Sequence, residues 1–120
     1  SYQTFVEADV VGSPSVAIIG TRRCTPYGRS VAGELGHDLA AAGVGVVSGL
    51  AAGIDAAAHE GTLDAANGRP PAAVVGTGLD VVYPRRSGRL WQAVADRGVV
   101  LSEYPLGTRP ERWRRSSSRA

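Results

Sequence analysis

Four short, unbroken apolar runs, separated by longer alanine-rich stretches, constrain the fold of this chain most strongly. The runs lie at residues 16–19 (VAII), 44–47 (VGVV), 72–75 (AAVV) and 99–101 (VVL), and each is followed by Gly or Ser. Apolar runs without polar alternation are typical of strands buried on both faces, as in parallel sheets. The alternation with helical stretches predicts an α/β fold with a doubly wound, mostly parallel sheet and helices on both faces.

Helical patterns occupy the stretches between the runs. In the first stretch, Thr25 is a typical N-cap and Pro26 a typical first helical residue. Val31, Leu35 and Leu39 then recur every four residues, which predicts an inward-facing apolar stripe.

A second helix is expected over about residues 54–66, before Asn67 and Gly68, and a third from about Ser87 to Gly98. The first dozen residues are a candidate edge strand near residues 5–8. The expected organisation is a lead-in or edge strand at 1–15, one domain at 16–113 and a basic, flexible tail at 114–120.

The basic residues are concentrated at one end of the chain. Residues 1–84 carry four arginines and eight acidic residues, whereas residues 85–120 carry nine arginines and three acidic residues. Such a basic segment favours an anionic partner such as nucleic acid, and a solvated tail is the alternative for Arg114, Arg115 and Arg119.

Length and composition favour a single soluble domain. The chain has 120 residues, and no apolar run approaches the ~20 residues that span a bilayer. No signal peptide precedes the first run, and the one cysteine, Cys24, excludes an internal disulfide. A cytoplasmic protein without membrane contact is therefore expected.

The turns that follow the four runs are the first place to look for a ligand. In an open α/β sheet, ligands bind outside the carboxyl ends of the strands, where free backbone N–H groups can hold an anion. The turns are small or polar, which favours an anion-binding edge over purely structural turns. They comprise Gly20, Thr21 and Arg22; Ser48, Gly49 and Leu50; Gly76, Thr77 and Gly78; and Ser102, Glu103 and Tyr104.

Three arginines are candidate phosphate ligands. Arg22 directly follows the first run, and a surface ion pair is the alternative role. Arg85 follows the Tyr-Pro after the third turn and is expected at the same edge, unless it is a solvated loop charge. Arg112 and Trp113 form a basic–aromatic pair suited to single-stranded nucleic acid, although Trp113 fits a core position equally well.

Motifs for several catalytic chemistries are absent. The sequence has no G-x-G-x-x-G after the first run, no P-loop and no G-x-S-x-G elbow. Cys24, His37 and His59 lack the spacing of metal ligands. Neither a cofactor nor a metal is expected.

The remaining titratable candidates have two interpretations each. Asp55 and His59 lie one helical turn apart, which is compatible with an acid–base dyad and, more often, with a simple contact along a helix. Asp80 and Glu103 are candidate site carboxylates, and they are expected to orient arginines or to accept hydrogen bonds from backbone amides.

Four ordered segments resemble the DNA-processing protein A (DprA/Smf) family. They are VAIIGTR at 16–22 with TPYG at 25–28, VVSGLAxGIDxxAH at 46–59, VGTGLDVxYP at 75–84, and LSEYP at 101–105 with GT at 107–108. The similarity extends over about residues 16–113.

This resemblance implies an extended Rossmann-like domain that binds single-stranded DNA without hydrolysing it. It also implies the RecA recombinase as a partner, a role in natural transformation, and a homodimer in full-length members. Relative to the family, the sheet is expected to be incomplete. The residues implied to line or shape the DNA site are Gly20, Thr21, Arg22, Ser48, Gly49, Gly53, Gly76, Thr77, Gly78, Arg85 and Arg112.

Two other functions remain open at this point. One is a Rossmann-like nucleotide hydrolase that cleaves a base–ribose bond with help from Asp80 or Glu103, although its glycine-rich Glu motif is absent. The other is an inactive remnant, because an incomplete sheet exposes an unpaired edge strand.

Overall fold

Four parallel strands form the centre of the molecule in the computed structural model, which describes residues 14–110. In register, Val16 lies beside Val46 and Ala72 beside Val99. The strands are β1 (Ser15–Ala17), β2 (Gly45–Ser48), β3 (Ala72–Val75) and β4 (Val99–Ser102), and the helices are α2 (Pro26–Ala41), α3 (Ile54–Asp64), the 3₁₀ turn η1 (Arg85–Ser87) and α4 (Gly88–Arg97).

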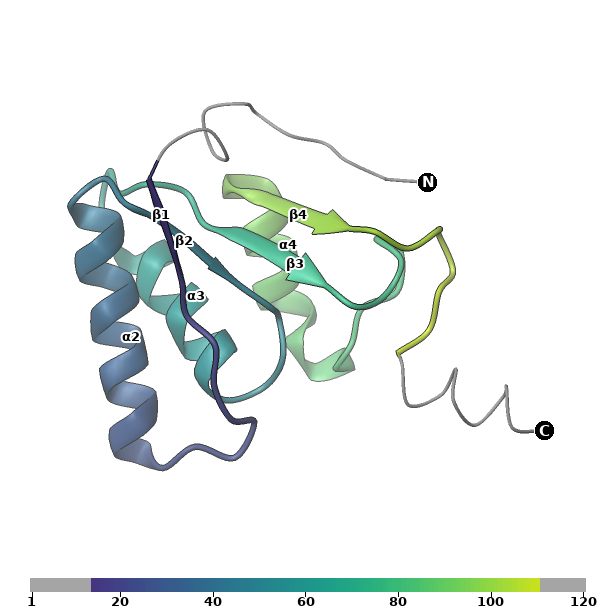
Figure 1. The fold of residues 1–120 in the computed structure, drawn as a ribbon, viewed down its shortest axis with the longest axis horizontal. Coiled ribbons are helices and arrows are strands. Elements are labelled where there is room, and N and C mark those ends of the chain that lie inside the picture. The colour runs from purple at the N-terminus through teal and green to yellow at the C-terminus, as the bar shows by residue number, and fades with distance from the viewer. Residues whose placement is uncertain (1–13, 111–120) are drawn as a thin grey trace.

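The strands follow one another in space in the order β1-β2-β3-β4, and all point the same way (Figure 1). The predicted α/β fold with a parallel, Rossmann-like sheet is confirmed. Helices were expected on both faces, but α2, α3 and α4 all cover one face, with α3 packed between the other two. The reason is topological, because consecutive right-handed crossovers place every helix on the same side until the strand order reverses.

Local sequence explains where the first helix begins and ends. The Thr25 side chain accepts a hydrogen bond from the Gly28 amide at 3.0 Å, and Pro26 takes the first helical position, as predicted. After α2, Gly43 adopts a φ of 82°, which a residue with a side chain rarely tolerates.

The face of α2 that packs on α3 differs from the predicted apolar stripe. Val31 and Leu35 are 42% and 45% exposed, so the prediction that they point inward is wrong. The buried positions are the small ones, Ala32, Gly36 and Ala40. Small residues let the two helices approach so closely that larger side chains have no room in the contact.

Glycines at the α2–α3 contact have almost no free space around them. A Cβ added to Gly36 would lie 2.4 Å from the Ala58 carbonyl oxygen, and one added to Gly61 would lie 2.0 Å from that of Gly33. Backbone therefore packs directly against backbone along these two helices.

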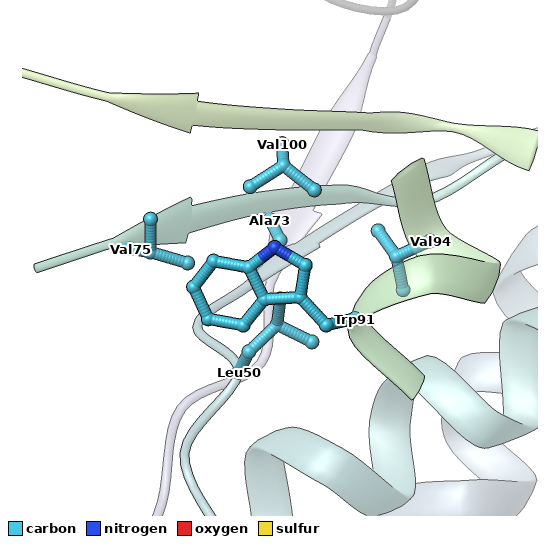
Figure 2. Packing of buried hydrophobic residues seen from close by; sticks show 6 residues of the cluster. All are labelled: Leu50, Ala73, Val75, Trp91, Val94 and Val100. Atoms are coloured by element: carbon cyan, nitrogen blue, oxygen red, sulfur yellow. The ribbon is translucent and has the colours of Figure 1, made fainter. Parts of the chain in front are cut away.

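The main apolar core lies between α4 and the sheet. Trp91 is 6% exposed and packs on Ala73 and Val100 from β3 and β4, with Val94 beside it (Figure 2). A smaller cluster of Ile18, Val46 and Ala58 lies under β1 and β2. The predicted third helix is confirmed, and its buried residues are Trp91 and Val94.

Several predictions concern residues outside the described range. They are the candidate edge strand near residues 5–8, the Arg112–Trp113 pair and the basic tail at 114–120. Among the helices of residues 14–110, none has the length and apolar character needed to cross a bilayer.

Replacing Gly61 by Ala should destabilise the fold. The added Cβ meets the Gly33 backbone, which must move, and overpacking of this kind costs about 1–3 kcal/mol of unfolding free energy. Urea denaturation followed by circular dichroism measures the change.

The matched control is Gly33→Ala on the facing helix, where the new Cβ would lie 3.6 Å from the Ala57 carbonyl oxygen, an ordinary contact. Because alanine favours a helix more than glycine does, the unfolding free energy of this variant should equal that of the parent or exceed it by up to about 1 kcal/mol. Equal stability of Gly61→Ala and Gly33→Ala would contradict the close packing.

Candidate nucleic-acid interface

The turns after β1, β2 and β3 meet at the carboxyl edge of the sheet and surround a groove of about 480 Å³, here called the first groove. Its volume is within the range of ligand-binding clefts. The lining combines arginines, tyrosines and small residues: Arg22, Arg23, Gly49, Leu50, Ala51, Ala52, Val74, Val75, Gly76, Thr77, Tyr83, Pro84, Arg86, Tyr104 and Pro110.

Three arginines give this groove its charge. Arg22 and Arg23 come from the turn after β1, and Arg86 comes from η1. All three are exposed, and among residues 14–110 none of them forms an ion pair with a carboxylate. The ion-pair alternative for Arg22 therefore finds no partner in the described part of the chain.

Aromatic and apolar side chains line the same groove. Tyr83 is half-buried and Tyr104 is 37% exposed, and both contribute to the lining. Val74 lies on the sheet face opposite the helices and is 47% exposed. The groove thus combines guanidinium groups with flat aromatic and aliphatic surfaces.

The turn after β1 is fixed by the start of α3. The Asp55 carboxylate accepts a hydrogen bond from the Gly20 amide at 3.3 Å, and the Ile54 amide donates to the Thr21 carbonyl at 3.2 Å. Gly53 has a φ of 85°, and a Cβ there would lie 2.4 Å from the Thr21 carbonyl oxygen. These contacts place Arg22 at the rim of the groove.

The turn after β2 is fixed by a second residue of α3. The buried His59 donates from Nε2 to the Ser48 carbonyl at 3.2 Å, and Ser48 Oγ donates to the Ile18 carbonyl at 2.5 Å. Asp55 and His59 thus each form a hydrogen bond to the backbone of a turn, and the Asp55 charge also acts on His59. The hydrogen bonds that the structure gives these two side chains support turns and do not join them as an acid–base dyad.

Hydroxyl groups fix the turns after β3 and β4. Ser102 Oγ donates to the Thr77 carbonyl at 2.6 Å, and Thr77 Oγ1 donates to the Val81 carbonyl at 2.8 Å. Gly78 is buried and donates its amide to the Thr108 carbonyl at 2.9 Å. A Cβ at Gly78 would lie 2.5 Å from the Pro105 carbonyl oxygen, so this glycine allows two loops to touch.

Nine of the eleven predicted site residues fall into two groups in the structure. Those that line the first groove are Arg22, Gly49, Gly76 and Thr77. Those that support its turns from behind are Gly20, Thr21, Ser48, Gly53 and Gly78.

Arg85 and Arg112 belong to neither group. Arg85 lines a neighbouring groove of about 1090 Å³, here called the second groove, and Arg112 lies outside the described residues. Glu103 lines neither groove. Asp80 lines the second groove, and its carboxylate accepts a hydrogen bond from the Gly107 amide at 2.6 Å, in agreement with the predicted role of holding a backbone amide.

Four charged or aromatic residues that line the first groove were not among the predicted site residues. Arg23 and Arg86 directly follow the predicted Arg22 and Arg85. Both arginines of the first pair line the groove, whereas only Arg86 of the second pair does, and the folded backbone of each turn decides this. Tyr104 belongs to the turn after the fourth apolar run, and Tyr83 stands in the third resemblance segment, but neither was predicted as a site residue.

Within residues 14–110, no three His, Cys, Asp or Glu side chains gather as a metal site would require. Cys24, His37 and His59 are thus not brought together as ligands.

Comparison with known proteins identifies the family. The sequence profile of DNA recombination-mediator protein A matches residues 6–117. The chain belongs to this family. The Protein Smf of Synechocystis is 48% identical over 99 residues, 82% of this chain and 24% of that protein. The DNA processing protein DprA of Streptococcus pneumoniae is 42% identical over 102 residues, 85% of this chain and 35% of that protein.

Two solved structures of the DNA recombination-mediator protein A family share the fold. DNA processing protein A from Helicobacter pylori, whose structure describes its single-stranded DNA binding mode, has a TM-score of 0.77 and 35% identity over 87% of this chain and 46% of that one. DprA from Streptococcus pneumoniae has a TM-score of 0.75 and 38% identity over 89% and 37%. The chain thus spans less than half of these structures, and about a quarter to a third of the curated relatives.

His59 makes stability dependent on pH in this family member. Burial lowers the pKa of His59 below its ordinary 6.5, opposed only in part by the backbone bonds to Ser48 and Gly49 and by the Asp55 charge. Within the described residues, Nδ1 is buried without a hydrogen-bond partner. Because the unfolded chain takes up the proton more readily, the unfolding free energy is highest above pH 6.5, where His59 is neutral in both states, and it falls progressively as the pH drops from 6.5 toward the lowered pKa of the folded state.

We expect the unfolding free energy to fall between about pH 7 and pH 5, with a slope of at most about 1.4 kcal/mol per pH unit. His59→Gln keeps an N–H donor for Ser48 and should flatten this slope. The exposed His37→Gln is the control for loss of a histidine and should keep it. Urea denaturation midpoints across this pH range measure the slope. A slope that is unchanged in His59→Gln would contradict the assignment of the pH dependence to His59.

Proposed function

We propose that this chain binds single-stranded DNA in the first groove, at the carboxyl edge of the sheet. The supporting observation is the set of three exposed arginines, Arg22, Arg23 and Arg86, that line this groove without a carboxylate partner in the described residues. Guanidinium groups bind phosphate oxygens through paired N–H donors, so three of them at one groove suit a phosphodiester backbone.

The apolar lining supports a single strand in preference to a duplex. Unpaired bases stack on aromatic side chains, and each such contact contributes about 1–3 kcal/mol. Tyr83 and Tyr104 lie in the same groove as the arginines, and Val74 adds an exposed aliphatic surface. In a duplex the base faces are already stacked on one another and are not available to these side chains.

The proposed role is binding without chemical change to the DNA. Among residues 14–110, no Asp, Glu or His lines the first groove, and the Thr77 hydroxyl donates to the Val81 carbonyl. In the second groove the Asp80 carboxylate is occupied by the Gly107 amide. No observation therefore favours the nucleotide hydrolase, and release of free base from a nucleoside monophosphate would contradict the proposed role.

The wider role proposed for the protein follows from its family. We propose that it functions in the cytoplasm, protects incoming single strands in natural transformation and assists loading of the RecA recombinase, as a homodimer. Because this chain spans only part of its relatives' length, these activities require tests on longer proteins that contain this segment.

Arg22→Ala should weaken binding of a fluorescein-labelled oligo-dT by about 1–3 kcal/mol, because a charge-assisted contact is lost. With three arginine–phosphate contacts, the slope of log affinity against log salt should be about −2, and it should become shallower by about 0.7 in the variant. Fluorescence anisotropy at several salt concentrations measures both quantities.

The matched control is Arg29→Ala, an exposed arginine of α2 that does not line the groove. It should retain both affinity and slope. An equal loss in Arg22→Ala and Arg29→Ala would indicate an effect of net charge alone and would contradict the assigned site. No binding by a folded parent chain would favour the inactive remnant.

A further inference from the structure

A second groove adjoins the first. It has a volume of about 1090 Å³ and lies between the segment at residues 80–88 and the segment at 107–110. Tyr83, Pro84, Arg86 and Pro110 line both grooves, so these residues form a shared boundary. The two grooves are therefore neighbours, and a ligand long enough to fill the first groove reaches the second by passing over this boundary.

The second groove is strongly basic. Arg85, Arg86 and Arg109 line it, and all three are exposed, whereas Asp80 is its only acidic lining residue among those described. Within residues 14–110, Arg85 and Arg86 have no ion-pair partner. The excess of positive charge favours a polyanion over a neutral or cationic ligand.

The two walls of this groove are fixed to each other. Besides the Asp80–Gly107 bond, the Gly78 amide donates to the Thr108 carbonyl at 2.9 Å, and Thr108 Oγ1 donates to the Pro105 carbonyl at 2.7 Å. The first two of these bonds join segments that are nearly thirty residues apart in the sequence, and the third fixes the turn within one wall. Arg85 and Arg109 thus come from opposite walls that are joined by hydrogen bonds, and a groove formed before the ligand arrives lowers the entropic cost of binding.

We propose that the second groove is a separate subsite for the continuing phosphodiester backbone, in which Arg85 and Arg109 contact phosphates beyond those held by Arg22 and Arg23. This inference rests on the proposed function. It predicts that the strand passes from the first groove across the boundary at Tyr83 and Pro84. It also predicts that the arginines of the two grooves differ in their dependence on oligonucleotide length.

The test compares two labelled oligo-dT probes, one of about 3 nucleotides and one of about 12 nucleotides, by fluorescence anisotropy. Arg109→Ala should weaken binding of the longer probe several-fold more than binding of the shorter probe. It should also make the slope of log affinity against log salt shallower by about 0.7 for the longer probe. Arg85→Ala should show the same selectivity. Arg22→Ala should weaken both probes, and Arg29→Ala, outside both grooves, serves as the control.

The outcomes separate this inference from the function on which it rests. Suppose that the parent binds both probes, and that Arg109→Ala and Arg85→Ala each weaken binding of the two probes by the same factor or leave it unchanged. The proposed second subsite is then wrong, while binding in the first groove remains supported. If the parent binds neither probe, the proposed function itself fails, and the subsite fails with it. Arg109→Lys, which keeps the charge, should recover part of the loss on the longer probe and thereby exclude misfolding as its cause.

Discussion

The hydrogen bonds from α3 to the ends of β1 and β2 are the interactions on which the site depends. Asp55 and His59 lie one turn apart on one buried helix, and each bonds to the backbone of a different turn. The position of α3 is itself set by backbone contact with α2 at Gly36 and Gly61. Small residues in the helix contact therefore help to set the position of the turns that form the first groove.

The one-sided arrangement of helices also shapes the groove. Because α2, α3 and α4 cover the same face, the described residues leave Val74 exposed on the other face, beside the turns that carry the arginines. A binding surface that is charged at the strand ends and apolar on the adjoining sheet face fits the two chemical parts of a nucleic-acid strand, the phosphates and the bases.

Much of this account was predictable from the sequence, and the failures have physical causes. Unbroken apolar runs predicted the strands, and the parallel direction of those strands brought the predicted turns to one edge. The periodicity of apolar residues predicted that Val31 and Leu35 are buried, because such a pattern ranks positions by hydropathy. The close contact between α2 and α3 instead buries small residues such as Gly36, and the larger side chains stay exposed. The assignment of Arg85 to the first groove missed Arg86, because neighbouring residues in a turn point in directions that only the folded backbone defines.

The central claim is that single-stranded DNA binds at the carboxyl edge of the sheet, and backbone amide chemical shifts test it most directly. Titration of the ¹⁵N-labelled chain with oligo-dT should shift the amides of the turns that line the first groove, including Arg22, Arg23, Gly49 and Gly76. Amides at the opposite edge, such as Gly43 and Gly98, should keep their positions. Shifts concentrated at that opposite edge, or on the outer face of α2, would contradict the account.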